Sequence, residues 1–123
     1  MKIVDRSTFL SLPAYTVYSK LNGICFGEIR IKFDSWGSNG DYRDMPLIEI
    51  SENSNELEMT DISAIYFREI ERSKEDFSYS IKMETEVISR DGLYKADQLF
   101  CVFEKKDVKM IISVLNKCFD NLK

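Results

Sequence analysis

The chain has 123 residues, of which 44% are hydrophobic and 31% are charged, and its formal net charge is −4. This length is close to the common size of one folding unit, so we expect a single domain over residues 1–123. No apolar run approaches the roughly 20 residues that cross a bilayer, and Asp5 and Arg6 come too early for a signal-peptide core. The composition therefore argues against a membrane protein and predicts a soluble, cytoplasmic one.

The sequence contains no histidine, and this limits the chemistry open to the chain. Histidine is the usual general base and the commonest metal ligand, so triad and metal-dependent mechanisms are disfavoured, although paired carboxylates could still exchange protons. The odd number and wide spacing of Cys25, Cys101 and Cys118 predict free thiols, with the last two in apolar, core-like contexts. We expect no catalytic residue, no cofactor and no metal, and predict that the protein is not an enzyme.

The first third of the chain predicts a short helix between strands. Residues 1–4 are typical of an edge strand, and Asp5 can cap a helix over residues 6–11 that ends before Pro13. Antiparallel strands over roughly 14–20 and 25–33 follow, joined by a turn at Asn22-Gly23. Gly27, inside the second of these strands, indicates a bulge or a close approach of another backbone.

The middle of the chain is less sharply patterned. Residues 34–41 are rich in glycine and small polar residues and predict a loop, and residues 45–50 predict a third strand. A helix begins near Thr60 or Asp61 by the spacing of its apolar residues. Strict alternation over residues 77–87 predicts a strand, which we expect to form a hairpin with residues 98–104.

The end of the chain carries the clearest pattern. Residues 98–103 predict a strand buried on both faces, and Asp107 is placed to cap an amphipathic helix. Its apolar residues recur at steps of three and four: Val108, Ile111, Ile112, Leu115, Cys118, Phe119 and Leu122. We therefore predict an α+β domain, with an antiparallel sheet of four or five strands and two main helices on one face. The other face could pair two copies, which would make the protein a homodimer.

The predicted loop suggests a candidate partner-binding site, formed by Trp36, Asp41, Tyr42 and Asp44. Large aromatic residues contribute strongly to interfaces, and here they lie beside acidic ones. The alternative is that Trp36 folds back onto the sheet and covers an edge, and this alternative is the one we favour. The same stretch does not match a calcium loop, because Trp36 and Asn39 stand where an oxygen ligand and a glycine are needed.

Negative charge is concentrated in residues 41–61, where seven acids face one arginine, Arg43. Such a surface would repel nucleic acid, so we expect no direct nucleic-acid binding. Ordinary solubilising charge is the commoner explanation. A second hypothesis is that the acids mimic nucleic acid and occupy a basic groove on another protein.

Two segments resemble short proteins of bacteriophages and prophages. One is Asp5-Arg6-Ser7-Thr8-Phe9-Leu10-Ser11-Leu12-Pro13-Ala14 with Thr16, and the other combines Arg90-Asp91-Gly92-Leu93 with Asp97-Gln98-Leu99-Phe100. In such proteins we expect glycine after the Pro-Ala pair, whereas this chain has Tyr15. The resemblance implies an origin in a mobile element and assigns no catalytic residues.

Three functional hypotheses follow. The first is a non-enzymatic phage or prophage-type protein that binds a host or phage protein, one form of it being inhibition of a host defence protein. The second is a small-molecule-binding domain or enzyme with a pocket between sheet and helices, lined by Tyr18, Arg30, Tyr66 and Tyr79. The third is a structural component of a virion.

Overall fold

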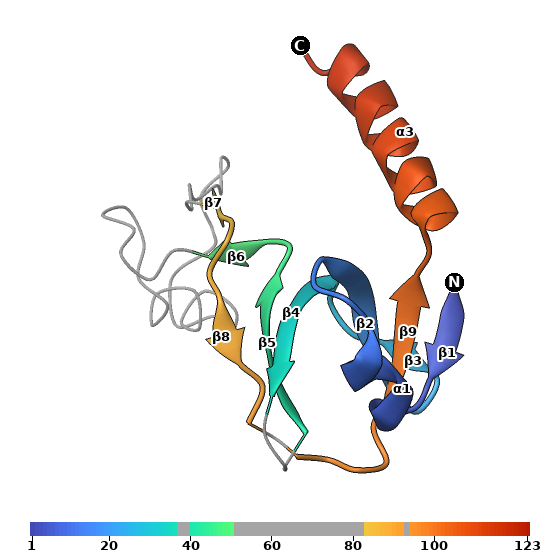
Figure 1. Ribbon diagram of the computed structural model, residues 1–123. Helices are drawn as coiled ribbons and strands as arrows, with labels where there is room; N and C mark the ends of the chain where they lie inside the picture. The colour runs from blue at the N-terminus through green and yellow to red at the C-terminus, as the bar shows by residue number, and fades with distance from the viewer. Residues whose placement is uncertain (37–39, 51–82, 93) are drawn as a thin grey trace, which may run out of the picture. The chain divides into compact units, whose positions relative to one another are not determined.

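The computed structural model describes residues 1–36, 40–50, 83–92 and 94–123 (Figure 1). These residues confirm an α+β protein with antiparallel strands and a C-terminal helix. The chain divides into two compact units, Met1–Leu47 with Glu86–Lys123, and Ile48–Thr85. The prediction of a single domain over residues 1–123 stays a prediction.

The first unit contains a seven-stranded sheet rather than the four or five strands expected. Its strands are ordered β1-β9-β2-β4-β5-β8, and β3 pairs with β2 beside this path. The strands are β1 (Lys2–Val4), β2 (Thr16–Asn22), β3 (Cys25–Phe26), β4 (Arg30–Trp36), β5 (Asp41–Pro46), β8 (Ser89–Arg90) and β9 (Leu99–Phe103). The described strands of this sheet pair antiparallel.

The N-terminal predictions hold closely. Strand β1 lies at the sheet edge, and α1 (Arg6–Ser11) begins after Asp5, whose carboxylate accepts a hydrogen bond from the Thr8 backbone N–H. Gly27 separates β3 from β4, and its N–H donates to the Lys20 carbonyl at 2.8 Å. A Cβ at Gly27 would lie 3.3 Å from that oxygen, so the glycine allows the close approach that the sequence indicates.

Two predictions in the middle of the chain are wrong. Trp36 belongs to β4, and β5 begins at Asp41, so strands occupy much of the predicted loop. The predicted hairpin between residues 77–88 and 98–104 is absent from the part of the chain described, because β9 pairs with β1 and β2 while β8 pairs with β5. The predicted helix near Thr60, and the strand from 77 to 82, lie outside the described residues.

One face of the sheet carries the core of the first unit. Phe9 of α1 stacks on Phe100 with ring centroids 3.9 Å apart, and Tyr18 and Tyr42 surround the pair at 4.6 and 5.0 Å from Phe9. All four side chains are fully buried. Helix α1, although it has only six residues, contributes Phe9 to this core, and Leu10 and Leu12 pack against it.

Helix α3 (Lys105–Asn121) follows β9 after a single residue, Glu104. Its N-cap is Glu104 rather than the predicted Asp107. Asp107 occupies position N3 and completes a capping box, because its carboxylate accepts a hydrogen bond from the Glu104 N–H at 2.8 Å. The Met1 amino group lies 2.7 Å from the same carboxylate. Figure 1 shows α3 leading away from the sheet, so the prediction that it covers a sheet face is wrong.

In the second unit, the described residues form a two-stranded antiparallel sheet of β6 (Glu49–Ile50) and β7 (Met83–Glu84). Glu49 pairs with Glu84, and Ile50 pairs with Met83. Of the predicted strand over residues 45–50, the structure assigns Met45 and Pro46 to β5 and the last two residues to β6. Across the described ranges, no helix is both long and apolar enough to cross a membrane.

Candidate functional site

The sheet face beneath α1 also carries a network of polar and charged side chains. Side chains alternate along a strand, so Tyr18 and Lys20 of β2 share this face. The register places Arg30 of β4 opposite Tyr18, and Asp44 of β5 opposite Lys32. Antiparallel pairing thus brings groups from three strands together.

Asp44 is the centre of this network. Its carboxylate is buried, accepts from the Tyr18 hydroxyl and pairs with the Arg30 guanidinium, whose Nε and Nη2 both donate to it. A guanidinium that contacts a carboxylate through two N–H groups forms one of the stronger ion pairs in proteins. The outer nitrogen of Arg30, Nη1, bonds to Glu28 instead.

Asp91 forms a second centre just after β8. Its side chain is 2% exposed and lies 2.6 Å from Lys20 Nζ and 3.7 Å from Arg6 Nη1. Arg6 comes from α1 and also donates to the Gly40 carbonyl at 2.7 Å. The two centres hold α1, β2, β4, β5 and the end of β8 together by charge as well as by ring packing.

Burial raises the pKa of Tyr18 above its ordinary value, with Tyr42 and Asp44 adding to the effect. Burial likewise raises the pKa of Tyr42, which also contacts Tyr18. Both hydroxyls therefore stay protonated at neutral pH and act as hydrogen-bond donors. Burial alone would lower the pKa of Arg30, but its contact with Asp44 holds it above the usual value.

Asp41 and Arg90 form a neighbouring ion pair. Burial by itself would raise the pKa of Asp41, but Arg90 and the backbone N–H groups of Gly92 and Tyr42 hold it below its ordinary value. The Arg90 guanidinium also lies 5.9 Å from the centre of the Trp36 ring, within cation–π range. Asp41 thus stays charged and joins β5 to the turn after β8.

The structure separates the four residues of the predicted partner-binding site. Trp36 is 41% exposed, whereas Asp41, Tyr42 and Asp44 are at most 2% exposed. A partner could touch Trp36 directly, but the other three face the interior of the first unit. Whether these four bind a partner stays a prediction, and the structure gives three of them a role in holding the sheet and α1 together.

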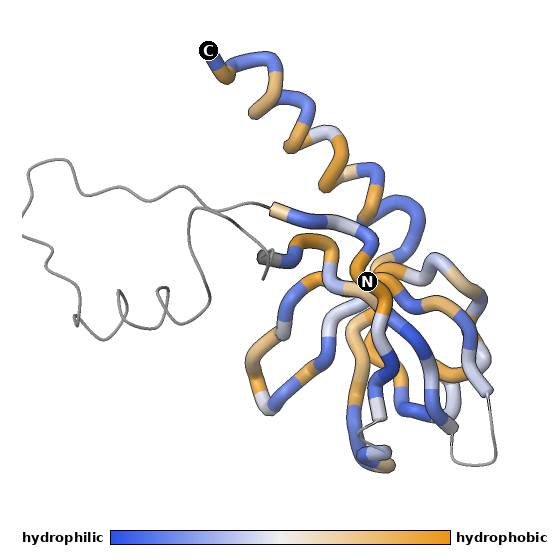
Figure 2. Tube along the Cα trace, turned by 90° about the vertical axis from the view of Figure 1, so that its left-hand side faces the viewer, coloured by the Kyte–Doolittle hydropathy of each residue, from blue (hydrophilic) through white to orange (hydrophobic). Residues whose placement is uncertain are grey.

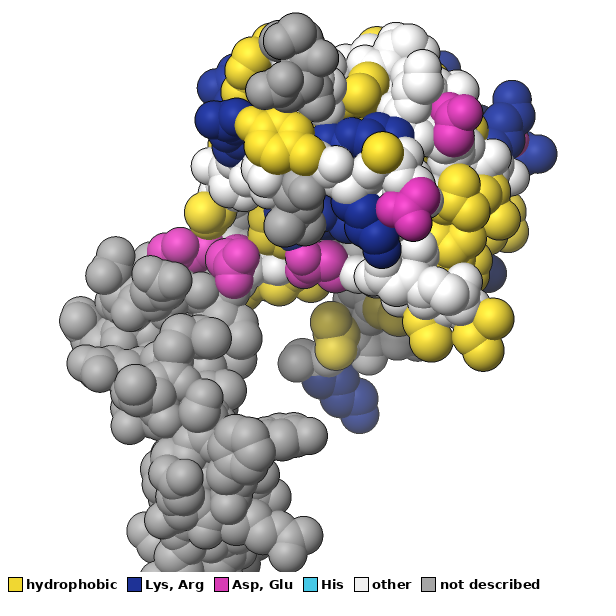
Figure 3. Space-filling model, turned by 90° about the horizontal axis from the view of Figure 1, so that it is seen from below, with side chains coloured by type: hydrophobic (Ala, Val, Ile, Leu, Met, Phe, Trp, Pro, Cys, Tyr) yellow, Lys and Arg dark blue, Asp and Glu magenta, His cyan; other side chains and the backbone are white. Residues whose placement is uncertain are grey.

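The acid-rich stretch 41–61 also looks different in three dimensions. Asp41 and Asp44 are neutralised by Arg90 and Arg30, and Arg43 pairs with Asp34 at 2.8 Å. Figure 3 shows some acidic side chains beside basic ones on one face and further acidic side chains in a row. The acids Glu52, Glu56, Glu58 and Asp61 lie outside the described residues. The described part of the stretch therefore supplies no continuous acidic surface for mimicry.

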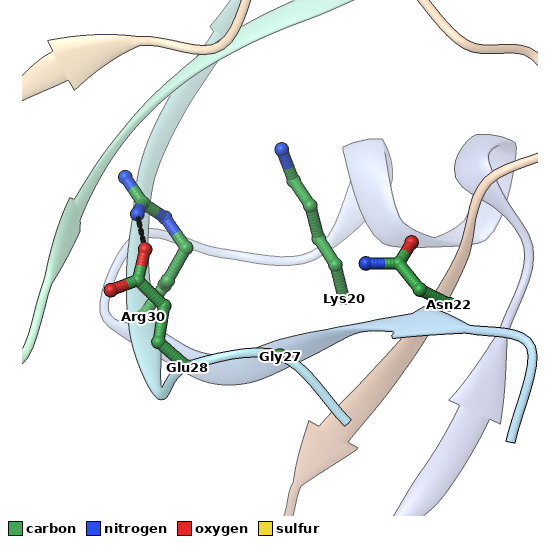
Figure 4. A pocket seen from close by; sticks show the side chains of 5 residues that line it. All are labelled: Lys20, Asn22, Gly27, Glu28 and Arg30. Carbon is green, nitrogen blue, oxygen red and sulfur yellow. Dashed lines mark hydrogen bonds and ion pairs between the residues drawn. The ribbon is translucent and has the colours of Figure 1, made fainter. Parts of the chain in front are cut away.

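A hollow of about 210 Å³ opens beside the network. It is lined by Lys20, Asn22, Gly27, Glu28 and Arg30, and in Figure 4 the Lys20 and Arg30 side chains rise from neighbouring strands into the same space. Of these residues the sequence suggested only Arg30 as a pocket residue. Tyr18, Lys20 and Asn22 are spaced two residues apart, and this spacing predicts that Lys20 and Asn22 share the face of β2 that carries Tyr18.

Helix α3 presents a second candidate surface, because none of its residues is buried. Its exposed apolar side chains include Leu115 at 57% and Phe119 at 76%, and Leu122 just beyond it is 77% exposed. Cys118, predicted to lie in the core, is exposed, whereas Cys101 is buried as expected. Figure 2 shows apolar and polar residues alternating along the turns of this helix.

Comparison with protein-family models, with curated proteins and with solved structures finds no match to this chain. Within the described ranges, no group of three or more acidic or cysteine side chains is placed to hold a metal ion, and no buried side-chain nitrogen or oxygen lacks a hydrogen-bond partner. The polar network is thus internally satisfied. Within the described part of the chain, the hollow and α3 are two surfaces open to another molecule.

Proposed function

We propose that the protein is a non-enzymatic binding protein whose helix α3 docks into an apolar groove with an acidic rim on a different protein. The exposed apolar side of α3 is the observation that supports this proposal. Large apolar side chains gain roughly 1.5–3 kcal/mol each when they are buried, so a helix with several of them exposed favours association. The resemblance to phage and prophage proteins directs the search for the partner to host and phage proteins.

The spacing of the apolar residues fits a helix that binds in a groove. Val108, Leu115 and Leu122 are seven residues apart, as are Ile112 and Phe119. This spacing places them along one side of the helix, which is the arrangement of anchors by which an amphipathic helix binds a groove. A single groove on the partner can therefore bury the whole apolar side of α3.

The charge of α3 supports an acidic rim on the partner. The helix carries four lysines, Lys105, Lys106, Lys109 and Lys117, against two aspartates, Asp107 and Asp120. Asp107 is already paired with the Met1 amino group. A second α3 would present the same excess of positive charge, and like charges facing each other oppose pairing of two copies.

The helix is also held at its start in a way that keeps its apolar side available. Glu104 alone links it to β9, and Glu104 pairs with Lys2 at 3.0 Å while Asp107 pairs with Met1. These contacts tie the first turn of α3 to the edge strand β1. The helix would have to break them to turn back onto the face that α1 covers.

The test uses the full chain and a partner purified after capture from host or phage extracts. Leu115→Glu with Phe119→Glu should weaken binding of that partner by more than about 30-fold, the loss expected when hot-spot anchors are replaced. The matched control, Ser113→Glu with Asn116→Glu, adds the same charge on the polar side beside the lysines and should weaken binding much less than the apolar variant does. Rising salt should weaken binding by the unmodified chain, because the lysines face acids.

Three results would overturn the proposal. The double apolar variant could bind the purified partner as tightly as the control does. Size-exclusion chromatography could show a dimer that only the apolar variant disrupts, which would make a second copy the occupant. A large drop in the free energy of unfolding for the apolar variant alone would show that residues of the same chain cover α3.

A further inference from the structure

The hollow beside β2 brings two cations together at a partly exposed position. Its walls carry two cations, Lys20 and Arg30, whose side chains are 21% and 17% exposed. The Asn22 amide stands on the same strand two residues beyond Lys20, and Figure 4 shows it beside the lysine. Three hydrogen-bond-donating groups therefore converge on one small space.

Glu28 contacts Arg30 from the solvent side, whereas the other charges near the hollow are buried. In the network beneath α1, Arg6 and Lys20 pair with Asp91 and Arg30 pairs with Asp44, while the buried Lys32 ammonium donates to the Leu12 and Phe33 carbonyls. Glu28 contacts Arg30 Nη1 at the mouth of the hollow. Glu28 is 59% exposed, so this last ion pair lies in water whereas the others are buried.

We propose that the hollow binds a small molecule through an oxyanion group, a carboxylate or a phosphate, and that Glu28 occupies the position of this group when no ligand is bound. An exposed ion pair contributes only about 0–1 kcal/mol, so Glu28 can be displaced by a better-placed anion. The ligand would accept from Arg30 Nη1 and from Lys20, whose ammonium has three N–H donors and uses one on Asp91.

The dimensions of the hollow restrict the ligand. Pockets for drug-sized molecules measure about 300–1,000 Å³, and this hollow of about 210 Å³ is smaller. It suits one oxyanion group with a short attached chain whose polar atom reaches the Asn22 amide. Gly27 also lines this space and lies against the β2 backbone at Lys20.

The test is a titration of the full chain, with inorganic phosphate in one arm and acetate in the other, at constant ionic strength maintained with chloride. Backbone amide NMR signals of residues 20–30 report binding at the hollow. Glu28→Gln should tighten binding several-fold, because the competing carboxylate is gone while the fold keeps its buried pairs. Asp120→Asn, an exposed site on α3, makes the same change of charge and serves as the matched control.

The two arms identify the ligand class. Tighter binding of phosphate indicates a phosphate ligand, and tighter binding of acetate indicates a carboxylate ligand. Asn22→Ala should weaken binding of a ligand that bears a second polar group, with the amide signals of β2 otherwise unchanged. If neither anion shifts these signals in the millimolar range, the proposal is wrong. It is equally wrong if Glu28→Gln and Asp120→Asn change the affinity alike, because the response would then reflect net charge rather than a site.

Discussion

Within the described ranges, Tyr15 is one of three residues other than glycine whose backbone has a positive φ. Its φ is 67°, a left-handed conformation that L residues with a Cβ adopt at a cost of about 1–2 kcal/mol. The position follows Pro13-Ala14 at the start of the segment that leads into β2. The tyrosine ring contacts Phe33 at 5.4 Å, and the backbone N–H donates to the Lys32 carbonyl at 2.7 Å.

Replacing Tyr15 by glycine and by alanine separates backbone strain from ring contact. Both variants lose the contact with Phe33, but only alanine keeps the strained Cβ. After allowance for the entropy of glycine in the unfolded chain, we expect Tyr15→Gly to be about 1 kcal/mol more stable than Tyr15→Ala in urea unfolding. The neighbouring Ala14→Gly, outside the left-handed region, should lower stability instead. Equal stability of the two Tyr15 variants would show that the left-handed backbone conformation at this position does not lower the free energy of unfolding.

At the scale of single elements, the junction of β9 and α3 makes a specific prediction. Asp107 accepts from the Glu104 N–H and pairs with Met1, and the Met1 amino group holds the pKa of this carboxyl below its ordinary value. Asp107→Ala removes both contacts, so the first turn of α3 should fray and its amide hydrogens should exchange faster. Asp120→Ala, near the other end of α3, should leave these amides unchanged. Faster exchange in both variants would mean that the capping box does not hold the junction.

Elements with strong local signals could be predicted from the sequence, and those set by distant partners could not. Asp5 predicts the start of α1, and the spacing of the apolar residues predicts α3, because capping and helical periodicity are local properties. The strand character of Trp36 depends on pairing with Asp41 across the hairpin, which glycine-rich composition obscured. The insertion of β9 between β1 and β2 joins segments about a hundred residues apart, and no local pattern encodes that choice.

The candidate site shows the same division. Tyr42, Asp41 and Asp44 were interpreted as surface groups because acids and a tyrosine beside a loop are usually exposed. Asp44 and Asp41 are buried against Arg30 and Arg90, which lie 14 and 49 residues away from them in sequence, and Tyr42 packs against Phe9. Alternation in β2 places Lys20 on the same face as Tyr18, but only the fold brings Asp91 to it. Charge pairing over such distances is a tertiary property.

Across the first unit as a whole, the two buried tyrosines tie stability to alkaline pH. The folded state holds the pKa of both Tyr18 and Tyr42 above the ordinary value of 10.0, chiefly because the rings are buried. Below pH 10 these hydroxyls are protonated in both the folded and the unfolded chain and contribute no pH dependence. Above it, the unfolded chain loses protons that the folded chain keeps, so the free energy of unfolding falls as pH rises.

Each tyrosine can contribute at most about 1.4 kcal/mol per pH unit to this fall. Tyr42→Phe removes one of the two groups, so the fall in unfolding free energy above pH 10 should be visibly shallower than in the unmodified chain. Tyr15→Phe makes the same chemical change at a side chain that is 75% exposed. Urea unfolding at a series of alkaline pH values, with tyrosinate absorbance recorded in parallel, measures both effects. If the two variants flatten the curve equally, burial at the centre of the first unit is not what couples its stability to pH.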